Sequence, residues 1–239
     1  MTTGEVLLRC EEAARTYGRG PTAVVAVHGA SCEVRAGDRI AVTGPSGSGK
    51  STLLHLMAGL ELPTAGRVGW PGLGQGPLAG KVGVVFQGPS LVPALDVAEN
   101  AALPLVLAGT PEDLARERAL DALDLVGAAD LVNKLPEELS GGQAQRVAVA
   151  RVVALRPRLV LADEPTGQLD RATGRHIIDV LLGAADEIGA ALVVTTHDPT
   201  VAERLDERWA MHEGRLVLAG SVDPAVPSAD AAHARGGTS

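Results

Sequence analysis

The chain has 239 residues, which is enough for one sizeable α/β domain with a smaller lobe. Its formal net charge of −8 argues against a general nucleic-acid binder, so we predict no nucleic-acid partner. Two cysteines, Cys10 and Cys32, are too few for a disulfide framework and are expected as free, buried thiols in a reducing compartment.

The sequence shows neither a secretory signal peptide nor an apolar run that could span a membrane. The N-terminal stretch MTTGEVLLRCEEAAR lacks a basic head and a long apolar segment. AALPLVLAG falls short of the roughly 20 apolar residues that a span requires, and Pro104 interrupts it. We therefore expect a cytoplasmic protein, whose membrane partner, if it has one, is another chain.

The first part of the chain alternates between strand signals and turns. Residues 6–18 and 22–34 are predicted as short strands joined by a Gly/Pro turn. RIAVTG is a β-branched strand that runs into a glycine-rich loop, and a helical pattern follows, with Leu53, Leu54, Met57 and Leu60 on one face. The Gly/Pro-rich residues 62–80 predict turns with one edge strand, and KVGVVFQ predicts the next buried strand.

From about Pro93 to Pro157 the apolar period becomes three to four residues, which predicts a block of helices forming a second lobe. RLVLADE and ALVVTTH are typical of buried parallel strands, and the amphipathic pattern between them predicts a helix. A short helix at DPTVAERL and a hairpin turning at Glu213-Gly214 are predicted to close the domain, and residues 221–239 are expected to form a disordered tail.

The loop GPSGSGKST matches the pattern G-x-x-x-x-G-K followed by Ser or Thr, between a predicted strand and a predicted helix. Its glycines allow successive backbone N–H groups to curl around a β-phosphate at a helix N-terminus. Lys50 is predicted to reach the β- and γ-phosphates, and the Ser51 hydroxyl to bind Mg²⁺. A glycine-rich turn without a ligand is disfavoured because both flanking elements are present. The residues predicted to bind the nucleotide are Gly44, Pro45, Ser46, Gly47, Ser48, Gly49, Lys50, Ser51 and Thr52.

Two acidic residues end the predicted strand RLVLA, at the sheet edge where ligands collect in open α/β folds. Asp163 is predicted to hold Mg²⁺. Glu164, pointing the other way along the strand, is predicted to orient or deprotonate a water molecule. A polar strand end before Pro165 is the plainer alternative, and the phosphate loop nearby argues against it.

Three further side chains are candidates with plainer alternatives. Gln87, at the end of KVGVVFQ, could reach the metal or the attacking water, but an ordinary strand-end amide fits equally well. His197 could donate to the γ-phosphate and position the water, or it could cap the following turn. Tyr17, the chain's single tyrosine, could stack on a base, although a lone aromatic residue usually serves packing.

The stretch LSGGQ predicts a second helix start that can bind an anion. Ser140 and Gln143 have the spacing of a capping box. Gly141 and Gly142 occupy the first helical turn, where each costs roughly 1 kcal/mol relative to Ala and leaves the amides open to a ligand. No lysine follows directly, so this site could support a phosphate but could not form a nucleotide pocket.

LSGGQAQRVAVAR resembles the signature motif of ATP-binding-cassette (ABC) ATPases. Tyr17, the phosphate loop, VVFQ with Gln87, LVLADEPTGQLD and His197 follow the order found in that family, and the resemblance extends to about Gly220. It implies an α/β fold with a P-loop NTPase (RecA-like) parallel sheet core, an N-terminal antiparallel β region and an inserted α-helical subdomain. Residues 1–220 would form one domain, with the core in 1–92 and 157–220 and the helical signature subdomain in 93–156.

The resemblance also implies Mg²⁺-dependent ATP hydrolysis coupled to transport, with Lys50, Gln87, Glu164 and His197 in catalysis and Ser51, Gln87 and Asp163 at the metal. In this family two cassettes hold two ATP molecules between them, which implies an ATP-bound homodimer. Ser140, Gly141, Gly142, Gln143 and Asp170 would then act in trans, on the partner's nucleotide.

Within the family, VVFQGPSLVPALDVAENAALPLVLAG resembles the subgroup of lipoprotein-release and macrolide-export systems. That implies a transmembrane permease subunit, export-type transport and a peripheral location on the inner face of the cell membrane. Gln168 departs from the subgroup's usual Asn, and the short Gly/Pro-rich stretch 66–80 predicts an abbreviated antiparallel region. A cassette driving a non-transporting division or cell-wall regulator remains an alternative. A soluble cassette of DNA repair or translation is disfavoured because the chain has one cassette and no basic patch.

Overall fold

The structure is a computed structural model and describes residues 4–218. Its centre is a six-stranded sheet in which neighbouring strands follow the order β5-β6-β7-β3-β8-β9. The first five strands are parallel, and β9 pairs antiparallel with β8. The strands are β3 (Arg39–Thr43), β5 (Val82–Val85), β6 (Leu159–Asp163), β7 (Ala191–Thr196), β8 (Glu207–His212) and β9 (Arg215–Val217). Every residue of β6 and β7 is buried, as expected for parallel strands covered on both faces.

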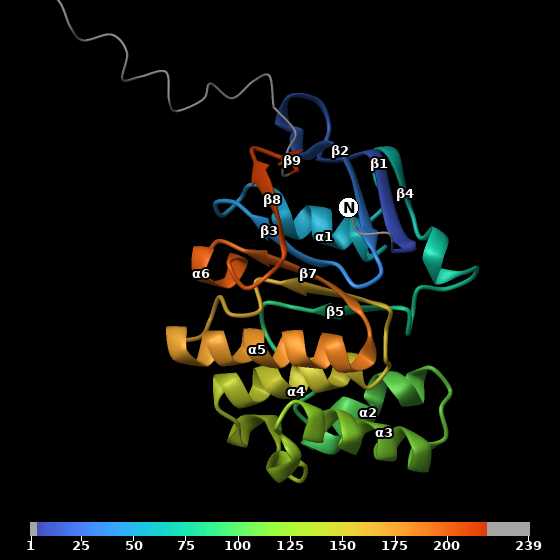
Figure 1. The fold of residues 1–239 in the computed structure, drawn as a ribbon, viewed down its shortest axis with the longest axis vertical. Helices are drawn as coiled ribbons and strands as arrows, with labels where there is room; N and C mark the ends of the chain where they lie inside the picture. Colours follow the sequence, from blue (N-terminus) through green and yellow to red (C-terminus); the bar gives the residue numbers. More distant parts are fainter. Residues whose placement is uncertain (1–3, 219–239) are drawn as a thin grey trace, which may run out of the picture.

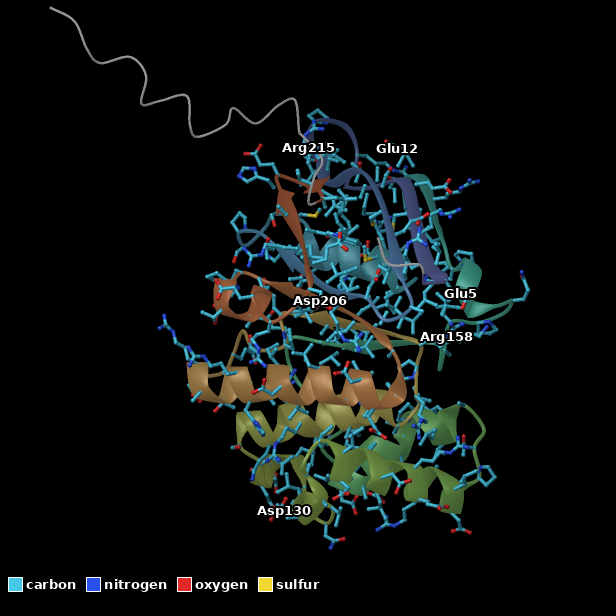
Figure 2. The ribbon with its side chains drawn as sticks, viewed as in Figure 1. Glu5, Glu12, Asp130, Arg158, Asp206 and Arg215 are labelled. Atoms are coloured by element: carbon cyan, nitrogen blue, oxygen red, sulfur yellow. The ribbon has the colours of Figure 1, made fainter. Side chains whose placement is uncertain are left out.

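A second, antiparallel sheet of order β2-β1-β4 covers one side of the core. It consists of β1 (Val6–Tyr17), β2 (Val24–Arg35) and the edge strand β4 (Ala65–Gly69), which confirms the edge strand predicted within residues 62–80. After β4 the chain forms a 3₁₀ turn, Pro71–Leu73. Glu5, beside β1, pairs at 2.6 Å with Arg158, just before β6, and both are labelled in Figure 2. This ion pair joins the small sheet to the central one.

The helices lie on both faces of the central sheet (Figure 1). α1 (Lys50–Met57) lies between the two sheets, and α5 (Arg171–Ile188) lies between the central sheet and the helical lobe. The lobe contains α2 (Val97–Leu107), α3 (Glu112–Leu125) and α4 (Gly141–Val153), which confirms the predicted helical block. Short α6 (Pro199–Ala202) follows β7. Within residues 4–218 no helix has the length and apolar character needed to cross the membrane.

The predicted apolar face of the first helix is wrong at its C-terminal end. α1 ends at Met57, and Gly59, with φ of +68°, turns the chain away from the helix axis. Leu60 is consequently 56% exposed, whereas Leu53, Leu54 and Met57 are buried as predicted. Glycine's access to the left-handed region explains why the helical period does not continue.

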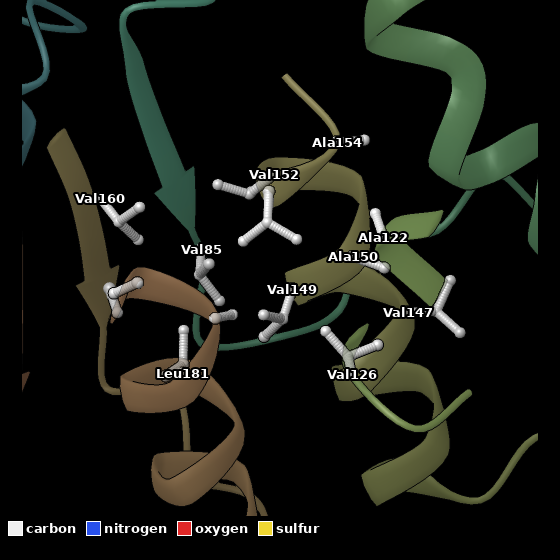
Figure 3. Packing of buried hydrophobic residues seen from close by; sticks show 14 of the residues in the cluster. Val85, Ala122, Val126, Val147, Val149, Ala150, Val152, Ala154, Val160 and Leu181 are labelled. Atoms are coloured by element: carbon white, nitrogen blue, oxygen red, sulfur yellow. The ribbon is translucent and has the colours of Figure 1, made fainter. Parts of the chain in front are cut away.

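Alternating side chains of the central strands build two cores. Val160 and Ala162 of β6 point towards the helical lobe, and Leu159 and Leu161 point towards α1 and the small sheet. Figure 3 shows the first core, where Val149 of α4 lies near β5 and α5. Small residues fill much of this core, so the helices approach the sheet closely.

Two local expectations about the small sheet and the closing hairpin are also confirmed. Cys10 and Cys32 are free, buried and directly opposite each other in β1 and β2. Glu213 and Gly214 form the turn between β8 and β9, and both have positive φ, as a type I′ hairpin turn requires. The predicted tail, 221–239, lies outside the described residues.

Candidate nucleotide site

The loop between β3 and α1 packs so tightly that two of its glycines admit no side chain. A Cβ on Gly44 would lie 2.2 Å from the carbonyl oxygen of Met211, and a Cβ on Gly49 would lie 2.2 Å from that of Ala26. Gly47 has open space around it but takes φ of +77°, which glycine adopts most readily. The loop therefore keeps its N–H groups at the start of α1, where an anion is stabilised by the helix dipole.

The C-terminal hairpin supports this loop from behind. The N–H of Gly214 donates to the carbonyl of Ser48 at 2.9 Å, and the carbonyl of Gly214 accepts from the N–H of His28 at 2.8 Å. The Thr43 hydroxyl, at the end of β3, donates to the carbonyl of Trp209 at 3.1 Å. These bonds hold the phosphate loop against β2 and β8.

Lys50 lies within the loop, with its side chain only 3% exposed. Its ammonium donates to the carbonyls of Gly44 and Pro45, both at 2.9 Å, and lies 3.2 Å from Oε1 of Glu164. These three partners match the three donors of a lysine ammonium. The positive charge is thus held at the centre of the loop that the sequence predicts to bind phosphate.

Ser51 and Asp163 meet as the sequence predicts, although they are 112 residues apart. The Ser51 hydroxyl donates to Oδ1 of the buried Asp163 at 2.9 Å. Hydroxyl and carboxylate oxygens are the ligands that Mg²⁺ prefers, so these residues fit the metal. Nowhere in residues 4–218 do three His, Cys, Asp or Glu side chains gather to hold a metal.

The backbone places Glu164 differently from the prediction that it continues the strand. β6 ends at Asp163, and Glu164 takes φ of +41°, which is uncommon for a residue with a side chain. Its carboxylate lies between Lys50 and His197, with Oε2 3.0 Å from Nδ1 of the histidine. The alternative that His197 caps the next turn is wrong, because Asp198 does so by accepting from the N–H of Thr200 at 2.8 Å.

Gln87 and Glu164 lie on one pocket with the phosphate loop. The pocket has a volume of about 340 Å³. Its lining consists of Ala26, Ser46, Gly47, Gly49, Lys50, Ser51, Thr52, Gln87 and Glu164. Gln87 follows β5 and is exposed, so its amide is accessible from the pocket. The structure thus brings the predicted phosphate, metal and water ligands to one edge of the sheet.

Side chains of α4 fasten the segment around Gln87 to the helical lobe. Gln145 donates to the carbonyl of Phe86 at 3.2 Å. Arg151 donates to the carbonyls of Ser90 and Pro89 at 2.8 and 3.1 Å. Burial lowers the pKa of Arg151. A movement of the lobe would therefore displace the backbone on both sides of Gln87.

Tyr17 lies at the end of β1, outside the phosphate-loop pocket. Its hydroxyl bonds to the carboxylate of Glu61, with distances of 2.6 and 2.7 Å to the two oxygens. The guanidinium of Arg15 lies 4.8 Å from the ring centroid, so one face of the ring is covered. A base could stack only on the other face.

The start of α4 has the predicted capping box. The Ser140 hydroxyl accepts from the N–H of Gln143 at 3.3 Å, and the Gln143 side chain accepts from the N–H of Ser140 at 2.9 Å. A Cβ on Gly142 would lie 2.4 Å from Cγ2 of Thr173, so close packing against α5 also requires this glycine. None of residues 140–143 lines the phosphate-loop pocket of the same chain.

Asp170, predicted to act on the partner's nucleotide, caps α5 within its own chain. Oδ1 accepts from the N–H groups of Ala172 and Thr173 at 3.0 and 3.1 Å, and Oδ2 accepts from the Thr173 hydroxyl at 2.6 Å. The bond from the Thr173 hydroxyl is the main cause that holds the pKa of Asp170 below its ordinary value, and the backbone bonds add to it. Its role in trans stays a prediction.

One residue at the site was missed in the sequence. Thr195 of β7 is fully buried, and its hydroxyl donates to Oδ1 of Asp163 at 2.7 Å. A β-branched residue in ALVVTT is typical of any buried strand, so the pattern contains no separate signal for a polar role.

A strand, a phosphate loop with a buried lysine, and a carboxylate two strands away in the sheet define a P-loop ATPase. Residues 27–167 match the family described as ABC transporter. The chain therefore belongs to the ABC transporter family, as an ATP-binding subunit that hydrolyses ATP. The expected family, fold class and ATPase activity are thus confirmed.

Similar proteins include lipoprotein-releasing system ATP-binding proteins LolD. Those of Legionella pneumophila (strain Paris), Chromohalobacter salexigens and Pseudomonas fluorescens are each 40% identical over 89% of this chain. The aligned regions cover 97%, 93% and 98% of these relatives, respectively. Among solved structures, the dimeric bacterial ABC transporter cassette MJ0796 has a TM-score of 0.78 at 34% identity, covering 88% of this chain and 96% of that one. The same cassette in a post-hydrolysis state with ADP and Pi has a TM-score of 0.78 at 33% identity, covering 90% and 100%.

Proposed function

We propose that this chain powers an export-type ABC system by hydrolysing ATP, as a homodimer bound to a separate transmembrane permease at the cytoplasmic face of the membrane. The names of the LolD relatives, which belong to lipoprotein-releasing systems, support the export direction. The placement of the Glu164 carboxylate between Lys50 and His197 carries the assignment of the hydrolysis site.

In this proposal the chain's own groups divide the reaction between them. The phosphate-loop amides and Lys50 bind the β- and γ-phosphates, while Ser51 and Asp163 hold Mg²⁺ with Gln87 nearby. Bound Mg²⁺ neutralises phosphate charge during transfer. Glu164 takes the proton of the attacking water, and His197, 3.0 Å from that carboxylate, orients both the carboxylate and the γ-phosphate.

The proposal of a homodimer is based on the separation, within one chain, of the two predicted anion-binding helix starts, those of α1 and α4. In one chain, residues 140–143 lie outside the pocket that the phosphate loop lines, and both Ser140 and Gly141 are exposed. A solved relative is a dimeric cassette. In the dimer, the exposed start of α4 would complete the partner's nucleotide site, and Tyr17 would stack on the base through its uncovered face.

The test is the variant Glu164→Gln, which keeps the shape of the side chain and removes its basicity. It should bind ATP, hydrolyse it at least about 100-fold more slowly and accumulate as a dimer in size-exclusion chromatography with light scattering. Lys50→Ala is the control, which should neither bind ATP nor dimerise. A wild-type turnover rate in Glu164→Gln would show that this carboxylate is not the base.

The same variant identifies the partner. With ATP, Glu164→Gln should retain a multi-span permease with a large extracytoplasmic domain when it is isolated from native membranes. Recovery of a cell-wall regulator without a translocation path would overturn the export proposal and leave the ATPase assignment intact.

A further inference from the structure

Thr195 occupies a central position in the sheet. β7 lies between β6, which ends at Asp163, and β3, which leads into the phosphate loop. In the parallel register Thr195 is the partner of Asp163, and its side chain is fully buried. A buried hydroxyl must find hydrogen-bond partners, because leaving it unpaired is unfavourable.

The Thr195 hydroxyl contacts both acidic residues of the site. It donates to Oδ1 of Asp163 at 2.7 Å and accepts from the backbone N–H of Glu164 at 2.9 Å. The same N–H lies 3.2 Å from the carbonyl of Thr195. Thr195 thus holds Glu164 at φ of +41°, the conformation that turns its carboxylate towards Lys50 and His197.

The bond to Asp163 also fixes the orientation of its carboxylate. The hydroxyls of Ser51 and Thr195 both donate to Oδ1. With Oδ1 occupied from two sides, the carboxylate cannot rotate without losing both bonds.

We propose that Thr195 is a positioning residue that sets the metal-facing orientation of Asp163 and the backbone turn of Glu164 through one hydroxyl. The inference rests on the proposed roles of these two acids. Partners that orient metal ligands in this way typically contribute about 10- to 100-fold to metal affinity or activity.

The experiment replaces Thr195 by Val, which keeps the branched shape and removes the hydroxyl. The main readout is the dissociation constant of Mn²⁺, measured by electron paramagnetic resonance in the presence of a non-hydrolysable ATP analogue. We expect Thr195→Val to raise this constant about 10-fold or more. Binding of the analogue in EDTA should not change, because the phosphate loop is untouched. Thr195→Ser should restore the Mn²⁺ affinity, since it keeps the hydroxyl.

Thr196→Val is the matched control on the same strand. The Thr196 hydroxyl accepts from the N–H of Asp198 at 3.0 Å, and within the described residues no hydrogen bond joins it to either acid, so its loss should leave the Mn²⁺ affinity unchanged. An equal weakening in Thr196→Val, or wild-type affinity in Thr195→Val, would overturn the inference. If Thr195→Val does not fold, Thr195→Ala takes its place with the same expectation.

Asp163→Asn separates this inference from the proposed function. If Asp163→Asn weakens Mn²⁺ binding and Thr195→Val does not, only the role of Thr195 is overturned. If Asp163→Asn binds Mn²⁺ as the wild type does, the proposed metal role of Asp163 fails, and the inference fails with it.

Discussion

Alanine in place of Gly142 and alanine in place of Gly141 should change stability in opposite directions. Both glycines lie in the first turn of α4, where Ala alone would stabilise the helix by up to about 1 kcal/mol. A Cβ at Gly142, however, would lie 2.4 Å from Cγ2 of Thr173. At Gly141 the nearest atom is Cδ2 of Leu169 at 3.4 Å, close to ordinary contact with a flexible side chain.

The magnitude follows from how firmly Thr173 is held. Its hydroxyl donates to Asp170 at 2.6 Å, so the side chain cannot turn away without losing that bond. Overpacking typically costs about 1–3 kcal/mol, and the helix propensity of Ala offsets up to about 1 kcal/mol of it. Because Thr173 is held, we expect a cost in the upper part of this range, about 2–3 kcal/mol. Gly142→Ala should then lower the free energy of unfolding by about 1–2 kcal/mol, and Gly141→Ala should raise it by up to about 1 kcal/mol.

The assay is urea unfolding of the nucleotide-free protein, with Thr173→Ser as the rescuing change. Serine lacks Cγ2 but keeps the hydroxyl that bonds to Asp170. The double variant Gly142→Ala/Thr173→Ser should regain the stability lost in Gly142→Ala, giving a coupling free energy of about 1–2 kcal/mol. Equal gains in the two glycine variants, or no rescue, would refute the steric argument.

Three further predictions concern residues away from the phosphate loop. Arg151→Met should lower the free energy of unfolding by about 1–3 kcal/mol, because two backbone carbonyls lose their donor. A thermal unfolding midpoint equal to that of the wild type would contradict this. Hydrogen bonds from the Thr200 backbone and hydroxyl hold the pKa of Asp198 below its ordinary value. The stability that this carboxylate supplies is therefore complete above about pH 4 and is lost as the pH falls below it. The difference in free energy of unfolding between Asp198→Asn and the wild type, measured by urea unfolding, should consequently be smaller at about pH 3 than at neutral pH. Both thiols are buried, and a hydrogen bond with Cys10, together with burial, raises the pKa of Cys32. Ellman's reagent at about pH 8 should therefore label neither thiol until urea unfolds the chain; rapid labelling of the native protein would show that the thiols are accessible.

The phosphate loop could be predicted because its requirements are local. The glycines, Lys50 and Ser51 lie within eight positions. Each is expected to contact the nucleotide or its metal through its own backbone or side chain. The buried strands RLVLADE and ALVVTTH were equally clear, because strands covered on both faces need continuous apolar residues.

Three features that depend on contacts between distant residues could not be predicted. The positive φ of Glu164 depends on Thr195, in the next strand of the sheet. Gly142 is required because of close packing against Thr173 on a different helix. From the local sequence alone, this packing cannot be distinguished from a glycine that leaves the amides open to an anion. Tyr17 likewise meets Glu61, which is 44 residues away.

The phosphate loop follows β2, one of the two strands that support it, but the other, β8, is synthesised much later. The Trp209 carbonyl that accepts from Thr43 comes 166 residues later. At about 5–20 residues per second, the loop leaves the ribosome roughly ten to thirty seconds before β8 does. A nascent chain therefore carries the whole motif before β8 and the turn at Gly214 can contact it. Because nucleotide binds the folded site, ATP stabilises chains in which β8 has joined the sheet more than nascent chains in which it has not.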